Sequence, residues 1–230
     1  MLLKKIKATT VLVQLLTTVA CIIVLMYLFK KYNWQIRRAW AKMQSKLIGF
    51  KIIQKGKIDP NAKLLIINHQ SLLDIIVVEN LYPKNIAWVA KKEIADMFFF
   101  GHIVKVTDMI IVKREDKKSL IKLLKDVKDR IDKGRVVAIF PEGTRGDGER
   151  LLNFKVGAKI ISEKLDLKVQ PIVLTNTRKV LDSQNFVANK GVVCVEFLDS
   201  IDPKKDKQWY QKVQINMQET LNRLSSDNQS

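Results

Sequence analysis

The chain has 230 residues, 47% of them hydrophobic, so it is long and apolar enough to form a core and is not globally disordered. Its formal net charge of +18 indicates an anionic partner: nucleic acid, a membrane surface, a phosphorylated substrate or an acidic carrier protein. Aromatic residues make up 7% and are not interleaved with the lysines and arginines as a base-stacking surface requires, so we expect no nucleic-acid partner.

The N-terminal segment from Ala8 to Phe29 contains no charged residue. As a helix it would be about 33 Å long, enough for a hydrocarbon core of about 30 Å. A cleaved signal peptide is the main alternative, but the apolar run is long for one and no small-x-small cleavage site follows it. Basic residues flank both ends and are more numerous after the run, which predicts that the rest of the chain lies on the cytoplasmic side.

The next segment, about residues 34–48, has helical periodicity. Ile36, Trp40, Met43 and Leu47 share one helical face, and the basic residues of the segment fall largely outside it. This pattern predicts a basic amphipathic helix on an anionic bilayer surface, and the alternative is a helix packed on the folded domain. We therefore expect a membrane anchor over residues 1–50, with its apolar helix at 8–29, and a folded domain over residues 51–230.

From about residue 63 onward, buried strands alternate with helices. Strands are predicted over 63–68, 86–90, 109–114, 135–140, 169–174 and 192–197, and helices over 116–133, over 153–165 and from Pro203 onward. Asn153 is a plausible N-cap for the second of these helices. Repeated alternation predicts an α/β fold with a mostly parallel sheet flanked by helices.

Polar residues follow three of the predicted strands at their carboxyl ends. Asn68 and His69 follow the first strand, Arg114 ends the third, and Glu142 to Arg145 follow the fourth. Because ligands of open α/β sheets bind at the carboxyl ends of strands, these clusters are candidates for one site.

His69 and Asp74 have a spacing that suits a catalytic pair. If a helix begins near Ser71, the Asp74 carboxylate can hold Nδ1–H of His69 and leave Nε2 free to take a proton. No Ser or Cys lies in a nucleophile-elbow motif, so the attacking oxygen is expected to come from a substrate. For this pair alone, the alternative is a helix-capping histidine beside a solvated aspartate.

Four motifs occur in a fixed order between about Ile66 and Leu174. The first motif, NHxxxxD, contains Asn68, His69 and Asp74. The second contains Lys91-Lys92-Glu93-Ile94, Phe99-Phe100-Gly101 and Arg114. The third is FPEGTR, from Phe140 to Arg145, followed by Phe154, Lys155, Gly157 and Ala158, and the fourth is a strand around Pro171. This ordered set resembles the 1-acylglycerol-3-phosphate acyltransferase family.

The resemblance implies a glycerolipid acyltransferase-like α/β fold with an N-terminal membrane helix or helical hairpin. It implies transfer of a fatty acyl group from acyl-CoA or acyl carrier protein to the sn-2 hydroxyl of lysophosphatidic acid, giving phosphatidic acid in phospholipid synthesis. His69 would be the general base and Asp74 would orient it, with direct transfer and no covalent enzyme intermediate. No cofactor and no metal are expected.

The acceptor carries a phosphate, so its site needs cations. Arg114 and Arg145 can grip phosphate oxygens bidentately through their planar guanidinium groups. Gly143 would let the backbone approach the substrate closely, and Glu142 could accept hydrogen bonds from acceptor hydroxyls. The complete set of expected substrate-binding residues is Arg114, Glu142, Gly143, Thr144, Arg145, Lys91 and Lys155.

The second motif departs from the family pattern at two positions. Phe98 stands where proline is usual, and Asp108 stands where glycine is common. The run from Met97 to Phe100 cannot place all its rings in a core from one regular helix. It is expected either to contact the bilayer or an acyl channel, or to form a tightly packed helix end.

Three other functions are alternatives. The acceptor could be glycerol 3-phosphate, a lysophospholipid or an aminoacyl lipid, since the motifs suit such enzymes too. A non-catalytic, basic membrane-binding protein would explain the charge but not the paired NHxxxxD and FPEGTR motifs. A zinc enzyme is disfavoured because the two histidines are far apart and lack a cysteine pair. We expect an inner or plasma membrane location, with the catalytic domain on the cytoplasmic side.

Overall fold

The computed structural model of the protein describes residues 2–112 and 117–227. Within these residues the main sheet has seven strands in the order β1-β9-β6-β2-β5-β3-β4. The strands are β1 (Phe50–Gly56), β2 (Leu64–Ile67), β3 (Ile86–Lys91), β4 (Ile110–Val112), β5 (Val136–Ile139), β6 (Val169–Thr175) and β9 (Gly191–Phe197). All neighbouring pairs are parallel except β6 with β9. The predicted α/β fold with a mostly parallel sheet is confirmed.

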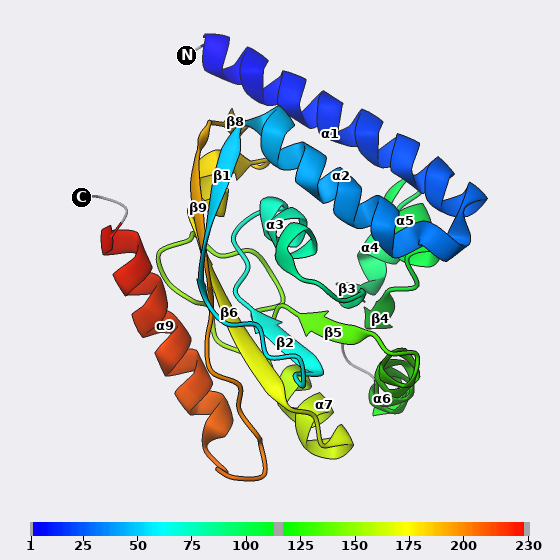
Figure 1. The fold of residues 1–230 in the computed structure, drawn as a ribbon, viewed down its shortest axis with the longest axis vertical. Helices are drawn as coiled ribbons and strands as arrows, with labels where there is room; N and C mark the ends of the chain where they lie inside the picture. Colours follow the sequence, from blue (N-terminus) through cyan, green and yellow to red (C-terminus); the bar gives the residue numbers. More distant parts are fainter. Residues whose placement is uncertain (1, 113–116, 228–230) are drawn as a thin grey trace.

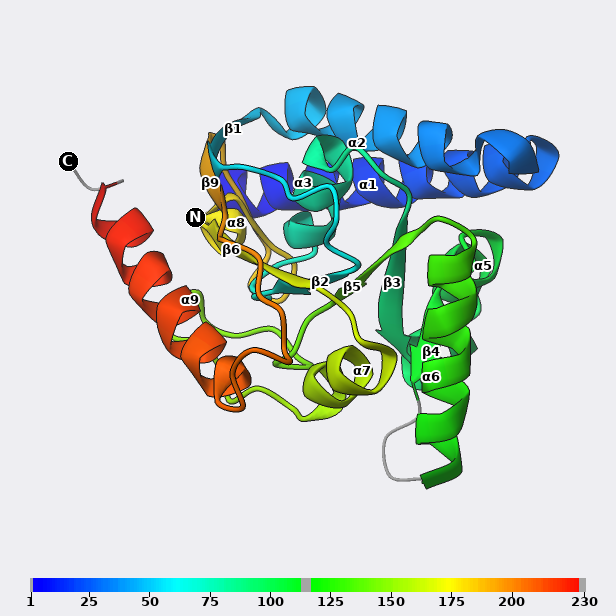
Figure 2. The ribbon, with the colours of Figure 1, turned by 60° about the horizontal axis from the view of Figure 1, so that its bottom comes forward.

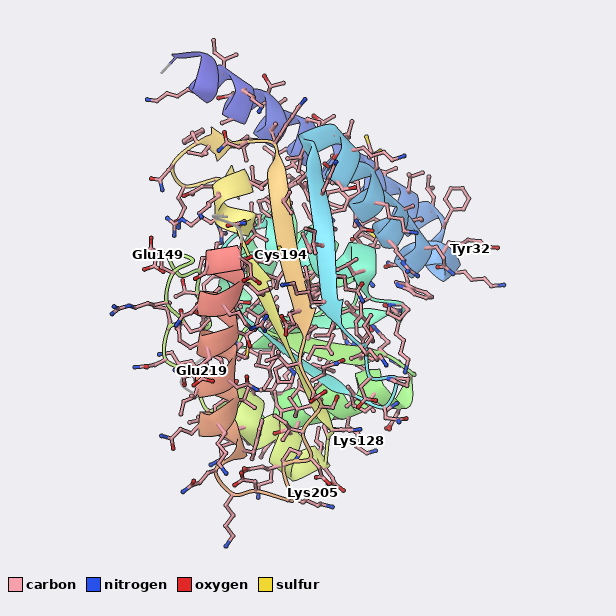
Figure 3. The ribbon with its side chains drawn as sticks, turned by 60° about the vertical axis from the view of Figure 1, so that its left-hand side comes forward. Tyr32, Lys128, Glu149, Cys194, Lys205 and Glu219 are labelled. Atoms are coloured by element: carbon pink, nitrogen blue, oxygen red, sulfur yellow. The ribbon has the colours of Figure 1, made fainter. Side chains whose placement is uncertain are left out.

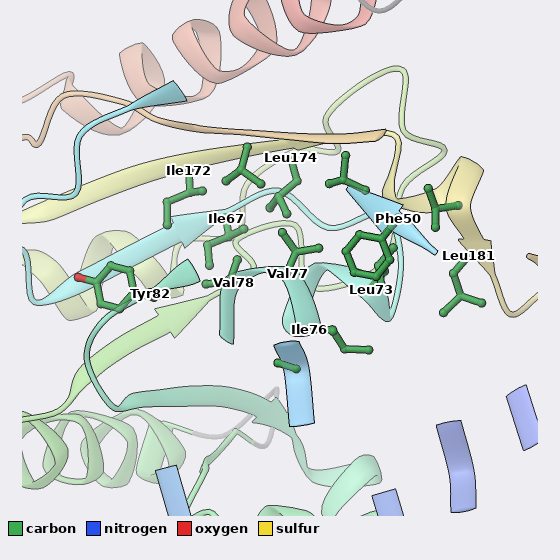
Figure 4. Close-up of a cluster of buried hydrophobic side chains, with 14 of the residues drawn as sticks. Phe50, Ile67, Leu73, Ile76, Val77, Val78, Tyr82, Ile172, Leu174 and Leu181 are labelled. Atoms are coloured by element: carbon green, nitrogen blue, oxygen red, sulfur yellow. The ribbon is translucent and has the colours of Figure 1, made fainter. Parts of the chain in front are cut away.

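Helices cover both faces of this sheet (Figures 1 and 2). On one face lie α1 (Leu2–Leu28), α2 (Asn33–Ile48) and α3 (Leu73–Leu81); on the other lie α6 (Lys117–Asp132), α7 (Gly157–Leu165) and α9 (Trp209–Asp227). Side chains of the central strand β2 pack with both groups of helices, because successive side chains of a strand point to opposite faces. Leu65 and Ile67 pack with the first group, and Leu64 and Ile66 with the second; Figure 4 shows Ile67 within the first cluster.

Shorter elements connect these layers. A 3-10 turn, η1 (Lys30–Tyr32), joins α1 to α2. Two short helices, α4 (Lys92–Asp96) and α5 (Phe100–Val106), follow β3, and α5 packs against α1. After β6 come α8 (Thr177–Val180) and a two-stranded ribbon of β7 (Leu181–Asp182) and β8 (Val187–Ala188).

The α1 and α2 helices form a hairpin with a polar seam. Gln44 donates to Thr18 Oγ1 at 3.1 Å and accepts from Gln14 at 3.0 Å, and Trp40 Nε1 also donates to Thr18 Oγ1 at 3.0 Å. The seam accounts for two polar residues inside the apolar N-terminal run, Gln14 and Thr18. Among the described residues, Lys5–Leu28 is the one helix long and apolar enough to cross a membrane, by length and composition alone.

The α2 helix packs on the domain along a face other than the apolar face named from the sequence. Its buried residues are Arg37, Ala41, Gln44 and Ile48, whereas Leu47 of the apolar face is 52% exposed. Arg37 is buried because Nη1 pairs with Glu79 Oε1 of α3 at 2.6 Å. One basic residue therefore lies in the interior, and α2 packs on the domain along that face.

Two further sequence expectations need correction, and one strand was missed. The helix predicted from Asn153 begins at Gly157, and Asn153 does not cap it; the preceding loop is held where Lys155 N–H donates to the Pro141 carbonyl at 2.8 Å. The last helix begins at Trp209 rather than at Pro203. The strand β1 was not predicted, and its mixture of exposed and half-buried residues explains the weak signal.

Candidate active site

The candidate site lies at the carboxyl ends of β5, β2 and β6. The strand β2 pairs with β5 on one side and with β6 on the other, so the loops that follow all three meet at one edge. Two of the three predicted polar clusters, at 68–69 and 142–145, lie here. The third contains Arg114, which falls outside the described residues.

His69 and Asp74 are in direct contact. Nδ1–H of His69 donates to Oδ2 of Asp74 at 2.7 Å, and this carboxylate is fully buried in the first turn of α3. The same oxygen accepts the backbone N–H of Gln70 at 2.6 Å and of Ser71 at 2.8 Å. These bonds fix the loop and the imidazole tautomer together, and Nε2 makes no hydrogen bond within the described part of the chain.

An aromatic stack fixes the plane of the imidazole. The Phe140 ring lies on the His69 ring with centroids 3.9 Å apart and an interplanar angle of 13°. Trp88 stacks on Phe140 in turn, at 5.4 Å, and its Nε1 donates to Glu79 at 2.8 Å. Since Glu79 is the partner of Arg37, a continuous series of contacts joins the N-terminal hairpin to His69.

Glu142 holds the backbone of the histidine loop. Its Oε1 accepts the N–H of His69 at 2.8 Å, and its Oε2 accepts the N–H of Leu152 at 2.7 Å. The Gly146 N–H donates to the His69 carbonyl at 2.8 Å, so His69 is held from both sides. Burial raises the pKa of Glu142 to about 7, against the effect of its two backbone hydrogen bonds.

The last three residues of the FPEGTR motif, Gly143 to Arg145, are more exposed than Glu142. Gly143 has φ of 68°, a left-handed conformation that favours glycine, and Thr144 is exposed. Arg145 is half-buried and donates to Ser183 Oγ at 3.2 Å. Its guanidinium therefore lies beside the segment that follows α8.

The two lysines among the candidates lie on separate elements. Lys91 ends β3 and is half-buried, and Lys155 is exposed in the loop before α7. The backbone of Lys155 is fixed, since its carbonyl accepts the hydroxyl of Tyr210 at 2.6 Å. Lys91 therefore lies at the carboxyl end of a strand, and Lys155 lies in the long connection between β5 and α7.

Several more residues organise this edge, and sequence reasoning missed the contribution of Gln70 and Arg178. The Asn68 side chain donates to the Leu174 carbonyl at 3.0 Å and accepts the Leu174 N–H at 2.7 Å, so it binds the end of β6. Gln70 donates to the same carbonyl at 2.9 Å. Arg178 donates to the Gly146 carbonyl at 2.7 Å and to Asp182 at 2.9 Å. The position of Arg178 just after a buried strand was a usable signal.

Comparison with known proteins decides the family. A family model described as Acyltransferase matches residues 49–175, from β1 through β6. The chain belongs to this acyltransferase family. The family resemblance stated from the motifs is therefore confirmed.

Relatives of the acyltransferase agree with this assignment. It is 45% identical to the 1-acyl-sn-glycerol-3-phosphate acyltransferase of Helicobacter pylori over 86% of this chain and 85% of that protein. It is 32% identical to a lyso-ornithine lipid O-acyltransferase of Rhizobium meliloti, over 55% of this chain and 42% of that protein. The crystal structure of the 1-acyl-sn-glycerophosphate acyltransferase PlsC of Thermotoga maritima has the same fold, with a TM-score of 0.77, 17% identity and coverage of 97% and 95%.

The departure of the acyltransferase at Asp108 has a structural explanation. Asp108 has φ of 55°, in the left-handed region where glycine is usual. Its carboxylate pairs with Arg130 at 2.7 Å, and its carbonyl accepts bonds from Arg130 at 2.9 Å and Arg135 at 3.2 Å. These arginine contacts stabilise the turn that an aspartate would otherwise strain.

Proposed function

We propose that the chain is a 1-acylglycerol-3-phosphate O-acyltransferase. It takes a fatty acyl group from acyl-CoA or acyl carrier protein and transfers it to the sn-2 hydroxyl of lysophosphatidic acid, forming phosphatidic acid for phospholipid synthesis. The observation that carries this is the 45% identity to a 1-acyl-sn-glycerol-3-phosphate acyltransferase over most of both chains. Both donors are anionic, which suits a chain of net charge +18.

The contacts of His69 support its role as general base. In this mechanism Nε2 takes the proton of the acceptor hydroxyl as its oxygen attacks the thioester carbonyl. The tetrahedral intermediate then breaks the carbon–sulfur bond, and the proton on Nε2 passes to the leaving thiolate. Asp74 holds Nδ1–H throughout and stabilises the transient imidazolium. No residue of the enzyme becomes acylated.

The acceptor phosphate is assigned to the cations around this edge. Arg145 is the first candidate because it projects from the loop that holds the His69 backbone. Arg114, Lys91 and Lys155 are the other candidates, with the Gly143-Thr144 backbone beside them. Glu142 has both carboxylate oxygens occupied by backbone N–H groups, which supports positioning of His69 rather than contact with acceptor hydroxyls.

The hairpin of α1 and α2 is assigned to the membrane. One side of α1 packs on the domain through Ala8, Leu15 and Met26, and the polar seam holds it to α2 along its middle. A helix held in this way lies along the domain, so we favour insertion into one leaflet over a span. Exposed side chains such as Val13 and Val24, each 57% exposed, would enter the lipid.

We also propose a boundary between residues 50 and 51 that separates the membrane anchor from the catalytic domain. The catalytic domain is assigned to the cytoplasmic side. Basic residues after α1 support that orientation and an anionic membrane surface as a partner. A protease-protection assay on inner-membrane vesicles of known sidedness tests it. Cleavage of the catalytic domain only in inverted vesicles is the expected result.

A second acceptor is favoured by one observation. The 32% identity to a lyso-ornithine lipid O-acyltransferase raises an aminoacyl lipid as the alternative to lysophosphatidic acid. That match covers 55% of this chain, against 86% for the 1-acyl-sn-glycerol-3-phosphate acyltransferase of Helicobacter pylori, so lysophosphatidic acid remains the first choice.

One assay distinguishes these acceptors. Purified protein in lipid micelles receives labelled acyl-CoA or acyl carrier protein, and lysophosphatidic acid is compared with glycerol 3-phosphate, lysophosphatidylcholine and a lyso-ornithine lipid. Phosphatidic acid formation that His69→Ala abolishes supports the proposal. Preferential transfer to another acceptor, or activity retained by His69→Ala, contradicts the acceptor or the base respectively.

A further inference from the structure

The turn between α4 and α5 exposes an unusual amount of apolar surface. Phe98 at this turn is 92% exposed, more than any other large hydrophobic side chain among the described residues. Met97 is 50% exposed beside it, and Ile94 in α4 is 40% exposed. A cluster of this kind on a surface marks contact with an apolar partner.

This turn is held in a fixed place at the end of α1. His102 Nδ1 lies 3.2 Å from the hydroxyl of Tyr27, and the rings of Phe98 and His102 meet edge to face. A Cβ on Gly101 would lie 2.4 Å from the Ala95 carbonyl oxygen, so the backbone closes tightly here. Behind the turn, one apolar cluster joins α5 to α1 through Phe99, Ile103, Val106, Ile22, Ile23 and Met26.

The same end of the molecule continues the exposed apolar surface of α1. Leu28 is 69% exposed and Phe29 is 53% exposed, and Tyr32 lies at the outer end of the hairpin (Figure 3). Figures 1 and 2 both show α5 beside this end of α1. Lys30, Lys31 and Lys105 are exposed around it, and the exposed Asp96 beside the turn is paired with Lys92. Apolar tips with an excess of lysines nearby fit the interface of an anionic bilayer.

From this geometry we propose that the α4–α5 turn is a second membrane-inserting element, with Phe98 at its tip. Lipid contact along α1 alone leaves the protein free to roll about the axis of that helix. A second apolar contact from a different segment, rigidly packed on that helix, fixes the roll. The hairpin thus provides attachment, and the turn sets the orientation of the domain on the bilayer.

The turn also connects to the reaction centre. It is joined through α4 to β3, whose Trp88 stacks on Phe140 and, through that ring, on His69. Fixing the turn in the lipid therefore holds the carboxyl-end edge of the sheet beside the membrane. This consequence rests on the proposed function, because it matters only if the acceptor is a lipid drawn from that bilayer.

Fluorescence tests the insertion itself. Phe98→Trp is reconstituted in phosphatidylcholine–phosphatidylglycerol vesicles whose acyl chains carry bromine, and the signal of the unmodified protein is subtracted. Ile215→Trp is the matched control, because Ile215 is 52% exposed on α9, across the sheet from α1. We expect loss of the added fluorescence at 98 and none at 215. An unquenched tryptophan at 98, or equal quenching at both positions, overturns the proposal.

Activity then tests the orientation. Phe98→Ser is expected to lower turnover of lysophosphatidic acid in vesicles about tenfold, an effect of the size expected when one phenyl ring no longer enters an apolar phase. Turnover of a short-chain, monomeric lysophosphatidate should not change, and Ile215→Ser should change neither. Equal losses of turnover with the vesicle-bound and the monomeric substrate would overturn the orienting role of the turn. If neither the unmodified protein nor its variants acylate the vesicle-bound or the monomeric lysophosphatidate, the proposed function fails. The quenching result still decides whether the turn inserts.

Discussion

Glu142→Gln should change how the stability of the protein depends on pH. The Glu142 carboxyl is buried, and its pKa is raised from 4.5 to about 7 by that burial. A raised pKa means that folding favours the protonated form, so the folded state loses stability as pH rises from about 4.5 to about 7 and keeps the penalty above that. At about 1.36 kcal/mol per pKa unit, the loss is about 3 kcal/mol.

Glutamine cannot titrate, so the variant lacks this loss. It keeps one carbonyl oxygen for the His69 N–H but leaves the Leu152 N–H without its acceptor, a cost of about 1–3 kcal/mol that does not vary with pH. The free energy of unfolding of the native protein minus that of the variant should therefore fall by about 3 kcal/mol between acidic and neutral pH.

Urea unfolding of both proteins in detergent micelles, followed by tryptophan fluorescence across this pH range, measures the difference. Other titrating groups are shared by the two proteins and cancel in the subtraction. If the two stability curves run parallel from acidic to neutral pH, the Glu142 carboxyl is not desolvated by the fold and the reasoning fails.

Three further substitutions test the site and its support. His69→Ala should abolish acyl transfer with an unchanged circular dichroism spectrum, and residual transfer well above background would remove His69 as the base. Arg145→Ala should raise the KM for lysophosphatidic acid about tenfold with kcat largely kept, if one charge-assisted contact to phosphate is lost; an unchanged KM would indicate a structural arginine. Glu79→Gln should destabilise the fold by about 3–5 kcal/mol in urea, because it leaves the buried Arg37 charge without a counter-charge; a loss below about 1 kcal/mol would show that the pair is solvated.

Local patterns in the sequence predicted the elements of the core well. The strands at residues 64–67 and 136–139 are continuous apolar runs because both faces of each are covered, and most of the strand at 169–175 is apolar for the same reason. Motif spacing also placed His69 and Asp74 together, since both lie within one strand–loop–helix unit. Both kinds of signal come from residues that are close in the chain.

What the sequence did not show depends on distant contacts. Arg37 looked like a surface cation until its partner Glu79, 42 residues away, was placed beside it. A motif gives residue types but not the direction of a carboxylate, so it did not show that Glu142 accepts the N–H of His69, 73 residues away. Asn153 had the chemistry of a helix cap, but the loop contact with Pro141 delays the helix to Gly157.

The short helix α3 has a practical consequence for work with this enzyme. It carries Asp74 in its first turn and Glu79 near its other end, where the carboxylate meets Arg37 from the N-terminal hairpin. Deleting the hairpin to obtain a soluble fragment would strip Glu79 of its counter-charge and uncover the apolar side of the same helix. Inactivity of such a fragment would then reflect a displaced Asp74, and could not be taken as proof that catalysis requires a bilayer. Detergent-solubilised full-length protein is the sound starting material for that question.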